Sequence, residues 1–169
     1  MTAVTLRPKP APQPNIRRIT RKDKPALIKI LRSTPEFKPF EVAVAEELIN
    51  ASLDDPCSSE YYILVADVLG VPAGYICYGP TPVTLGTWDI YWEAVARECQ
   101  GQGVGRALMA AALKEIKETG GRLAVIETSG IPSYEKTRRY YAGLGFETVA
   151  RIPDFYAPGD DQLILVKRL

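Results

Sequence analysis

Apolar and polar positions along the chain alternate with two different periods, and their order predicts a mixed α/β domain. Residues 62–66 and 73–78 are short apolar runs on either side of a Leu-Gly-Val-Pro turn, which predicts a β-hairpin. Before them, Leu27, Ile30 and Leu31 recur at the spacing of one helix face. A core built from such strands and helices is expected over most of the chain.

The same two periods predict a full series of elements. The predicted strands cover residues 16–19, 62–66, 73–78, 87–95, 123–128, 146–152 and 163–167, and the predicted helices run from Thr20 or Asp23 to Ser33 and over 40–53, 103–118 and 133–142. A Pro/Gly-containing loop is expected between the last two strands. Residues 1–14 hold four prolines and little that can pack, so we expect a tail or linker there, ahead of one domain at 15–169.

Composition narrows the possible functions. The net charge of +1 gives no overall attraction to nucleic acid or to an anionic membrane. No apolar run approaches the roughly 18 residues of a membrane-spanning helix, and the N-terminus has no signal-peptide core, so we expect a cytoplasmic protein. The chain has no histidine, and its three cysteines (Cys57, Cys77 and Cys99) form no C-x-x-C motif. A metal site is therefore not expected, and a His-based catalytic triad is impossible.

The strongest chemical signal is a glycine-rich turn between an apolar strand and a helix. Gly101, Gly103 and Gly105 follow the strand at 87–95 and open the helix at 103–118. Glycines let backbone N–H groups approach an anion closely, and a helix N-terminus adds about half a positive charge, which predicts a phosphate-bearing ligand. A P-loop is excluded because no Gly-Lys-Ser/Thr follows. A nucleotide ligand, with Glu127 as its ribose contact, and a plain turn remain open alternatives.

Two motifs resemble one known family. The run from Gln100 to Gly105 reads Q-x-x-G-x-G and resembles the pyrophosphate-binding signature of the GNAT family of N-acetyltransferases, which use acetyl-CoA. The run from Thr137 to Phe146 resembles the family's A-x-x-x-Y-x-x-x-G-F motif and follows the fifth predicted strand, as in the family. The resemblance implies a central mixed sheet of about six or seven strands flanked by four helices, with the strands at 87–95 and 122–128 splayed apart at one end.

The resemblance also implies a binding site for acetyl-CoA. Backbone groups near Ala94 and Val95 would pair with the pantetheine arm, as one strand pairs with another. Backbone N–H groups would hold the pyrophosphate; they belong to Gln100, Gly101, Gln102, Gly103, Val104, Gly105 and Arg106. Tyr134 stands where the family often has an asparagine that contacts the cofactor.

Acetyl transfer to an amine requires a neutral amine and a proton for the departing thiolate. By resemblance, Tyr141 is the general acid that protonates the sulfur, while the neighbouring Tyr140 is expected to pack in the core. Three carboxylates are candidates for the general base. Glu127 matches the position used by ribosomal-protein N-terminal acetyltransferases, and Asp89 matches the position used by histone-type relatives. Glu93 is expected to share a strand face with Asp89, because side chains alternate along a strand.

The acceptor site is expected between two walls. Phe37 and Phe40, between the first two helices, would form one wall. Residues 151–161 resemble the tyrosine-bearing loop of the ribosomal-type enzymes, where Tyr156, Asp154 and Asp160 would hold a cationic amine. The Asp residues are equally suited to forming a turn.

The resemblance implies direct transfer, in a ternary complex, to a peptide N-terminus or a small amino acid such as alanine. It also implies a homodimer, since relatives are often dimers. An acyl-CoA sensor without turnover and a nucleotide-binding protein are the alternatives.

Overall fold

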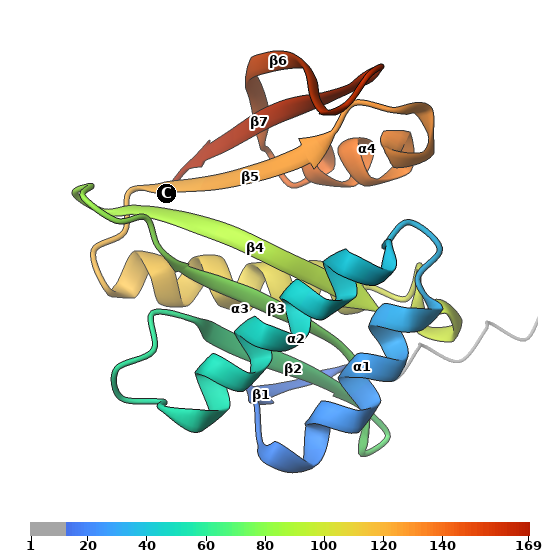
Figure 1. Cartoon of the computed structure of the whole chain (residues 1–169). Helices are drawn as coiled ribbons and strands as arrows, with labels where there is room; N and C mark the ends of the chain where they lie inside the picture. Colours follow the sequence, from blue (N-terminus) through green and yellow to red (C-terminus); the bar gives the residue numbers. More distant parts are fainter. Residues whose placement is uncertain (1–12) are drawn as a thin grey trace, which may run out of the picture.

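The computed structural model describes residues 13–169. Most of the predicted tail, residues 1–12, lies outside the described residues, so the division at residue 14 stays a prediction. Within the described part, strands and helices follow one another in the predicted order (Figure 1). The helices are α1 (Lys24–Ser33), α2 (Pro39–Asp54), α3 (Val104–Glu118) and α4 (Glu135–Gly143). The strands are β1 (Asn15–Arg18), β2 (Tyr62–Val68), β3 (Val71–Pro80), β4 (Thr87–Val95), β5 (Leu123–Ser129), β6 (Glu147–Ala157) and β7 (Asp160–Arg168).

The seven strands form one sheet in the order β1-β2-β3-β4-β5-β7-β6. Only β4 and β5 run parallel, and α3 is the crossover between them; every other pair is antiparallel. A parallel pair requires such a crossover, because a tight turn cannot connect two strands that run the same way. This arrangement confirms the predicted fold: a mixed sheet flanked by four helices.

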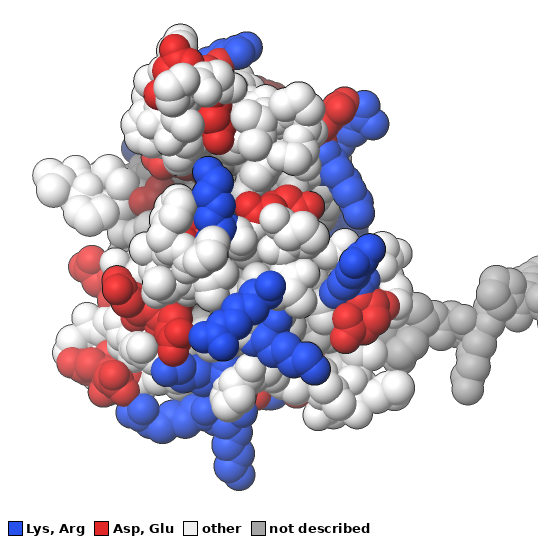
Figure 2. Space-filling model, turned by 45° about the vertical axis from the view of Figure 1, so that its right-hand side comes forward, with Lys and Arg blue, Asp and Glu red and all other residues white. Residues whose placement is uncertain are grey.

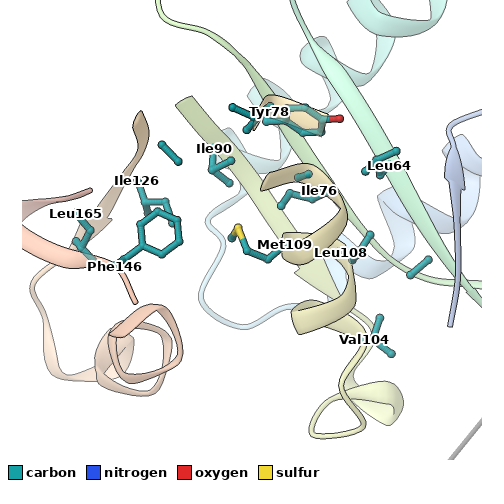
Figure 3. Packing of buried hydrophobic residues seen from close by; sticks show 14 of the residues in the cluster. Leu64, Ile76, Tyr78, Ile90, Val104, Leu108, Met109, Ile126, Phe146 and Leu165 are labelled. Carbon is teal, nitrogen blue, oxygen red and sulfur yellow. The ribbon is translucent and has the colours of Figure 1, made fainter. Parts of the chain in front are cut away.

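The two faces of the sheet bury two separate cores. On one face, Leu27 and Leu31 of α1 and Ile49 of α2 pack against the sheet. On the other face, α3 supplies an apolar stripe that includes Leu108 and Met109, which are fully buried. Figure 3 shows this second core continuing past α3 to side chains of the C-terminal half of the chain, namely Ile126, Phe146 and Leu165. Apolar packing on the α3 side of the sheet therefore holds strands β1–β4 and strands β5–β7 together.

The parallel pairing of β4 with β5 is short. It covers Thr87–Asp89 against Leu123–Val125, and beyond those residues the two strands diverge (Figure 1). A β-bulge lies directly after the last pair: Tyr78 is opposite Ile90 and Cys77 is opposite Trp92, so Tyr91 is an extra residue. A bulge bends its strand and increases its local twist, which accounts for β4 turning away from β5 at this point. The predicted splay is confirmed.

The β6–β7 hairpin corrects one sequence prediction. The expected loop at 153–162 is almost entirely strand, and only a tight turn at Pro158-Gly159 separates β6 from β7. A shift of register between Ile152 and Ala157 accommodates Pro153, which has no N–H to donate, in a bulged stretch. β6 is the edge strand of the sheet, where proline is tolerated.

Candidate active site

The splay leaves the β5-facing edge of β4 without a strand partner over residues 90–95, within the part of the chain that the structure describes. Ala94 and Val95 lie on this stretch, and β4 remains paired with β3 on its other side up to Val95. A free strand edge can pair with an extended ligand through main-chain hydrogen bonds. The geometry therefore suits the predicted contact between these residues and a pantetheine arm, which itself remains a prediction.

The glycine-rich loop lies at the end of β4 and opens α3. The Gln100 and Gln102 side chains fold back to donate hydrogen bonds to the carbonyl oxygens of Val95 (3.2 Å) and Glu98 (2.7 Å). Ala107 N–H is the first to donate within the helix, to Gly103 O at 3.0 Å. Across the described residues, no backbone acceptor therefore engages the N–H groups of residues 101–106.

The three glycines of this loop serve two different purposes. Gly101 and Gly103 have φ angles of +74° and +85°, and a Cβ at either would meet open space, so glycine is favoured there by conformation. Gly105 has no positive φ, but its Cβ would lie 3.0 Å from both Glu93 Oε1 and the Tyr140 hydroxyl oxygen. Free N–H groups at a helix N-terminus fit a pyrophosphate, and Arg106 places an exposed cation beside them.

Glu93 and Tyr140 form a buried pair beneath the first turn of α3. The Tyr140 hydroxyl donates to Glu93 Oε1 at 2.8 Å. Burial raises the pKa of Glu93 to about 8, although the Tyr140 hydrogen bond opposes this shift. Tyr140, expected only to pack, therefore also satisfies a buried carboxyl group. Sequence alone could not show this pairing, because the two residues are 47 positions apart and come together only in the folded chain.

Glu93 predicts a pH dependence of stability. The folded chain holds a proton on Glu93 up to about pH 8, whereas the unfolded chain releases it near the ordinary value of 4.5. Stability therefore falls as pH rises through this window, by up to about 1.4 kcal/mol per pH unit. Glu93→Gln keeps an acceptor for Tyr140 and cannot ionise. We expect its free energy of unfolding, measured with urea, to exceed that of the original chain by a margin that grows from pH 5 to pH 8; a margin independent of pH would contradict this assignment.

The bulge at Tyr91 also changes which carboxylates share a face. Asp89 alternates with Trp88 and Ile90, which pack on the α3 side, so Asp89 projects to the α1–α2 side. Glu93 lies on the α3 side, beside Gly105. The expectation that Asp89 and Glu93 share a face is therefore wrong, because the extra residue shifts the alternation by one.

Asp89 and Glu127 are the two predicted base candidates that the fold brings to one face. Glu127 alternates with the buried Ala124 and Ile126 on β5, so it also projects away from α3. Burial, followed by the negative charge of Asp89, raises the pKa of Glu127. Asp89 belongs to the last β4–β5 pair and accepts a hydrogen bond from Thr81 Oγ1 at 2.7 Å. Glu127 lies farther along β5, beyond the last β4–β5 pair.

Tyr141 of α4 lies beside the C-terminal part of the α3-side core. Its ring packs against Phe146, with centroids 6.1 Å apart, at the margin of the α3-side core. Burial, with smaller contributions from Glu93 and Tyr134, raises the pKa of Tyr141 well above its ordinary value, so the phenol is neutral at pH 7. No protein hydrogen bond to its hydroxyl is found within residues 13–169, in contrast to the neighbouring Tyr140. A neutral phenol without a protein partner is available as a proton donor.

The α1–α2 side forms a wall along the gap. Phe37 packs against Trp92 of β4, with ring centroids 6.3 Å apart. The Tyr134 hydroxyl donates to the carbonyl oxygen of Glu36 at 3.2 Å and so connects the start of α4 to the α1–α2 loop. Phe40 is 65% exposed and lies beneath the Lys38 ammonium, and its place in an acceptor wall stays a prediction.

The hairpin contributes the opposite wall, with different roles for its residues. Asp154 has a φ angle of +53°, donates its N–H to Asp161 Oδ1 and accepts from Gly159 N–H, so it shapes the turn. Asp160 is buried and accepts a hydrogen bond from Ser129 Oγ. Tyr156 remains 44% exposed on the acceptor side. Burial is the main cause that raises the pKa of Tyr156, and the charges of Glu127, Asp160 and Glu41 add to it.

One polar residue of this wall was not among the sequence candidates. Gln162 of β7 is 3% exposed and donates from Nε2 to Glu127 Oε2 at 2.6 Å. The signal available in the sequence is a glutamine at the start of an otherwise apolar strand. Its partner could be found only from the β5–β7 register, which places Gln162 opposite Ser129.

This geometry agrees with the comparison to known proteins. The model of the acetyltransferase (GNAT) family matches residues 24–146, well over half of the chain. The chain belongs to the GNAT family. Members of this family are acetyl-CoA-dependent acyltransferases, and solved relatives hold coenzyme A or acetyl-CoA.

Three similar proteins illustrate the relationship. A structure from Desulfovibrio desulfuricans, assigned to the GNAT acetyltransferases, is 41% identical, with a TM-score of 0.88 over 92% of this chain and 98% of that one. The ribosomal-protein-S18-alanine N-acetyltransferase from Escherichia coli is 21% identical, with a TM-score of 0.72 over 92% of this chain and 93% of that one, a likeness of fold. The uncharacterized N-acetyltransferase MJ1530 of Methanocaldococcus jannaschii is 29% identical over 109 residues, which cover 62% of this chain and 64% of that protein.

One face of this GNAT domain carries charges of both signs. On the face shown in Figure 2, Lys and Arg are interspersed with Asp and Glu. Within residues 13–169, no group of three or more Cys, Asp or Glu side chains is arranged to hold a metal ion. None of the helices in the described part is long and apolar enough to cross a membrane.

Proposed function

We propose that this GNAT domain transfers the acetyl group of acetyl-CoA to the primary amine of a cationic acceptor, foremost the N-terminus of a peptide. The observation that supports the proposal is that Glu127 lies on the α1–α2 face beyond the last β4–β5 pair, while Tyr141 of α4 lies at the margin of the core on the opposite face. A base on one side of the gap and an acid on the other suit direct attack in a ternary complex.

Acetyl-CoA supplies the activated acetyl group and the thiolate leaving group. The N–H groups of residues 101–106 and the free edge of β4 near Ala94 and Val95 would hold it. Glu127 accepts a proton from the acceptor ammonium, which frees the nitrogen lone pair for attack. The nitrogen bonds to the acetyl carbon, the C–S bond breaks, and Tyr141 gives its proton to the departing sulfur. The second proton that the nitrogen loses passes through water and restores the neutral phenol. An α-amine, with an ordinary pKa near 8, needs only modest help from such a base, whereas a lysine side chain near 10.4 needs much more.

Charge favours a peptide amine over a free amino acid. Glu41, Glu127 and Asp160 all act on the Tyr156 hydroxyl, and Glu36 joins Glu41 and Asp160 around Tyr134. The charged groups in both sets are carboxylates, and the Arg138 guanidinium beside them donates to the carbonyl oxygens of Ser129 and Ile131. Such surroundings attract an ammonium group and repel a carboxylate close beside it. A free amino acid carries that carboxylate, whereas a peptide N-terminus does not.

Alanine and alaninamide test this choice, because they differ only in the carboxylate. At equal concentrations of the neutral amine, we expect kcat/KM for alaninamide to exceed that for alanine at least tenfold, about 1.4 kcal/mol of repulsion avoided. Acetylated product is measured by mass spectrometry, with the dipeptide Ala-Ala as the matched peptide acceptor. Equal or faster acetylation of alanine would show that the site recognises the carboxylate and would overturn the proposed acceptor class.

A further inference from the structure

Gln162 has an unusual combination of burial and contact. Its side chain is 3% exposed, yet one of its amide hydrogens points to the most solvent-accessible of the base candidates, Glu127, at 2.6 Å. In the β5–β7 register Gln162 is opposite Ser129, and Glu127 lies two residues before Ser129, so all three side chains share the acceptor face. The amide thus holds one carboxylate oxygen and leaves Oε1 of Glu127 open.

The hairpin lies next to this contact. In the β6–β7 register Gln162 is opposite Ile152, just before the bulged stretch of β6 that contains Tyr156. Besides burial, the charge of Glu127 contributes to the raised pKa of the Tyr156 hydroxyl, so the two side chains are neighbours. Gln162 therefore lies between the base candidate on β5 and the edge strand β6.

The surrounding hairpin keeps this amide in place. Gly130 N–H donates to the carbonyl oxygen of Asp161 at 2.8 Å, and Ser129 Oγ donates to Asp160, so the start of β7 is attached to the end of β5. On the opposite face, Asp161 binds both the Arg151 guanidinium and the N–H of Asp154. These contacts fix the backbone on both sides of Gln162.

We propose that Gln162 is a positioning residue: it fixes the Glu127 carboxylate so that its free oxygen faces the acceptor amine. This inference rests on the proposed function, with Glu127 as the base. An N–H donor stabilises a carboxylate in its ionised form. The charge of Asp89 on β4 acts on Glu127, and Glu127 acts on Tyr156 of β6. On the α4 side, the Arg138 guanidinium donates to the carbonyl oxygen of Ser129, two residues farther along β5.

Gln162→Leu keeps the volume of the side chain and removes its donors. We expect the acid limb of the kcat/KM profile to move upward by about one pH unit and the plateau to fall about tenfold. Leu163→Ala, a neighbour that packs towards the α3-side core, controls for a loosened β7 and should lower stability without moving the limb. An acid limb that stays in place in Gln162→Leu would overturn the inference.

A second readout does not depend on activity. The pKa of Glu127, followed by carbon NMR of its carboxyl group, should rise by about one unit in Gln162→Leu and stay unchanged in Leu163→Ala. An unchanged Glu127 pKa in Gln162→Leu overturns the positioning role even in an active enzyme. If that pKa rises but no amine is acetylated by the original chain, the contact stands and the proposed function fails.

Discussion

Replacing Tyr141 by phenylalanine should lower kcat by about 10²–10⁴-fold, the usual contribution of a positioned general acid. The substitution removes one oxygen that makes no protein hydrogen bond within the described residues, and it keeps the ring that packs on Phe146. The fold and the dissociation constant for acetyl-CoA should therefore change little. Steady-state kinetics with the best acceptor, together with calorimetry of acetyl-CoA binding, measure the two quantities separately.

Tyr140→Phe is the matched control for this prediction. It removes the same group from the adjacent position, but that hydroxyl donates to the buried Glu93. We expect this variant to lose stability, because a buried carboxyl group loses its partner, at a cost of about 1–3 kcal/mol. Its turnover should exceed that of Tyr141→Phe. A Tyr141→Phe variant with undiminished kcat would show that another group protonates the sulfur.

Replacing Glu127 by glutamine should have the second largest effect, and the effect should depend on pH. Near pH 6.5 an α-amine is mostly protonated, so loss of the base should lower kcat/KM by about 10²–10³-fold. At pH 9 the amine is mostly neutral in solution and the deficit should shrink to about tenfold or less. The raised pKa of Glu127 places the acid limb of the original chain above the ordinary glutamate value.

Asp89→Asn distinguishes Glu127 from the other carboxylate on the same face. Asp89 belongs to the last β4–β5 pair and already accepts a hydrogen bond from Thr81. We expect its substitution to leave the acid limb of the kcat/KM profile in place or to shift it slightly to lower pH, because Glu127 loses a negatively charged neighbour. If Asp89→Asn abolishes the acid limb and Glu127→Gln does not, Asp89 is the base.

The sequence was sufficient to predict the fold, because each element carries a local signal. Strand and helix periods predicted the order of elements, and the glycines with the aromatic Tyr-x-x-x-Gly-Phe segment predicted the family. The proposal of Tyr141 as the general acid came from the same kind of signal, since its position follows from a motif with fixed spacing. All these features depend on residues close together in the chain.

Features that depend on contacts between distant strands could not be predicted. One extra residue at Tyr91 reverses the face of every later side chain on β4, and nothing in the local pattern marks a bulge there. The Gln162–Glu127 contact depends on the register of β7 against β5, and the Glu93–Tyr140 pair depends on a contact between β4 and α4. The last loop was mispredicted because Pro153 and Gly159 suggested a turn, whereas the edge strand accommodates the proline in a bulge.

The most direct test of the account is acetyl transfer from acetyl-CoA to a mixed panel of amines, followed by mass spectrometry. The panel holds short peptides, alaninamide, D- and L-amino acids, lysine peptides, polyamines and aminoglycosides. We predict a mass increase of about 42 Da, one acetyl group in place of one proton, on peptide N-termini and alaninamide, with little on free amino acids. Thermal stabilisation reports binding, because a ligand at 100 times its dissociation constant adds about 2.7 kcal/mol of stability. Acetyl-CoA left intact across the panel, together with stabilisation by ATP or NAD but not by acetyl-CoA, would contradict the proposed acetyl transfer.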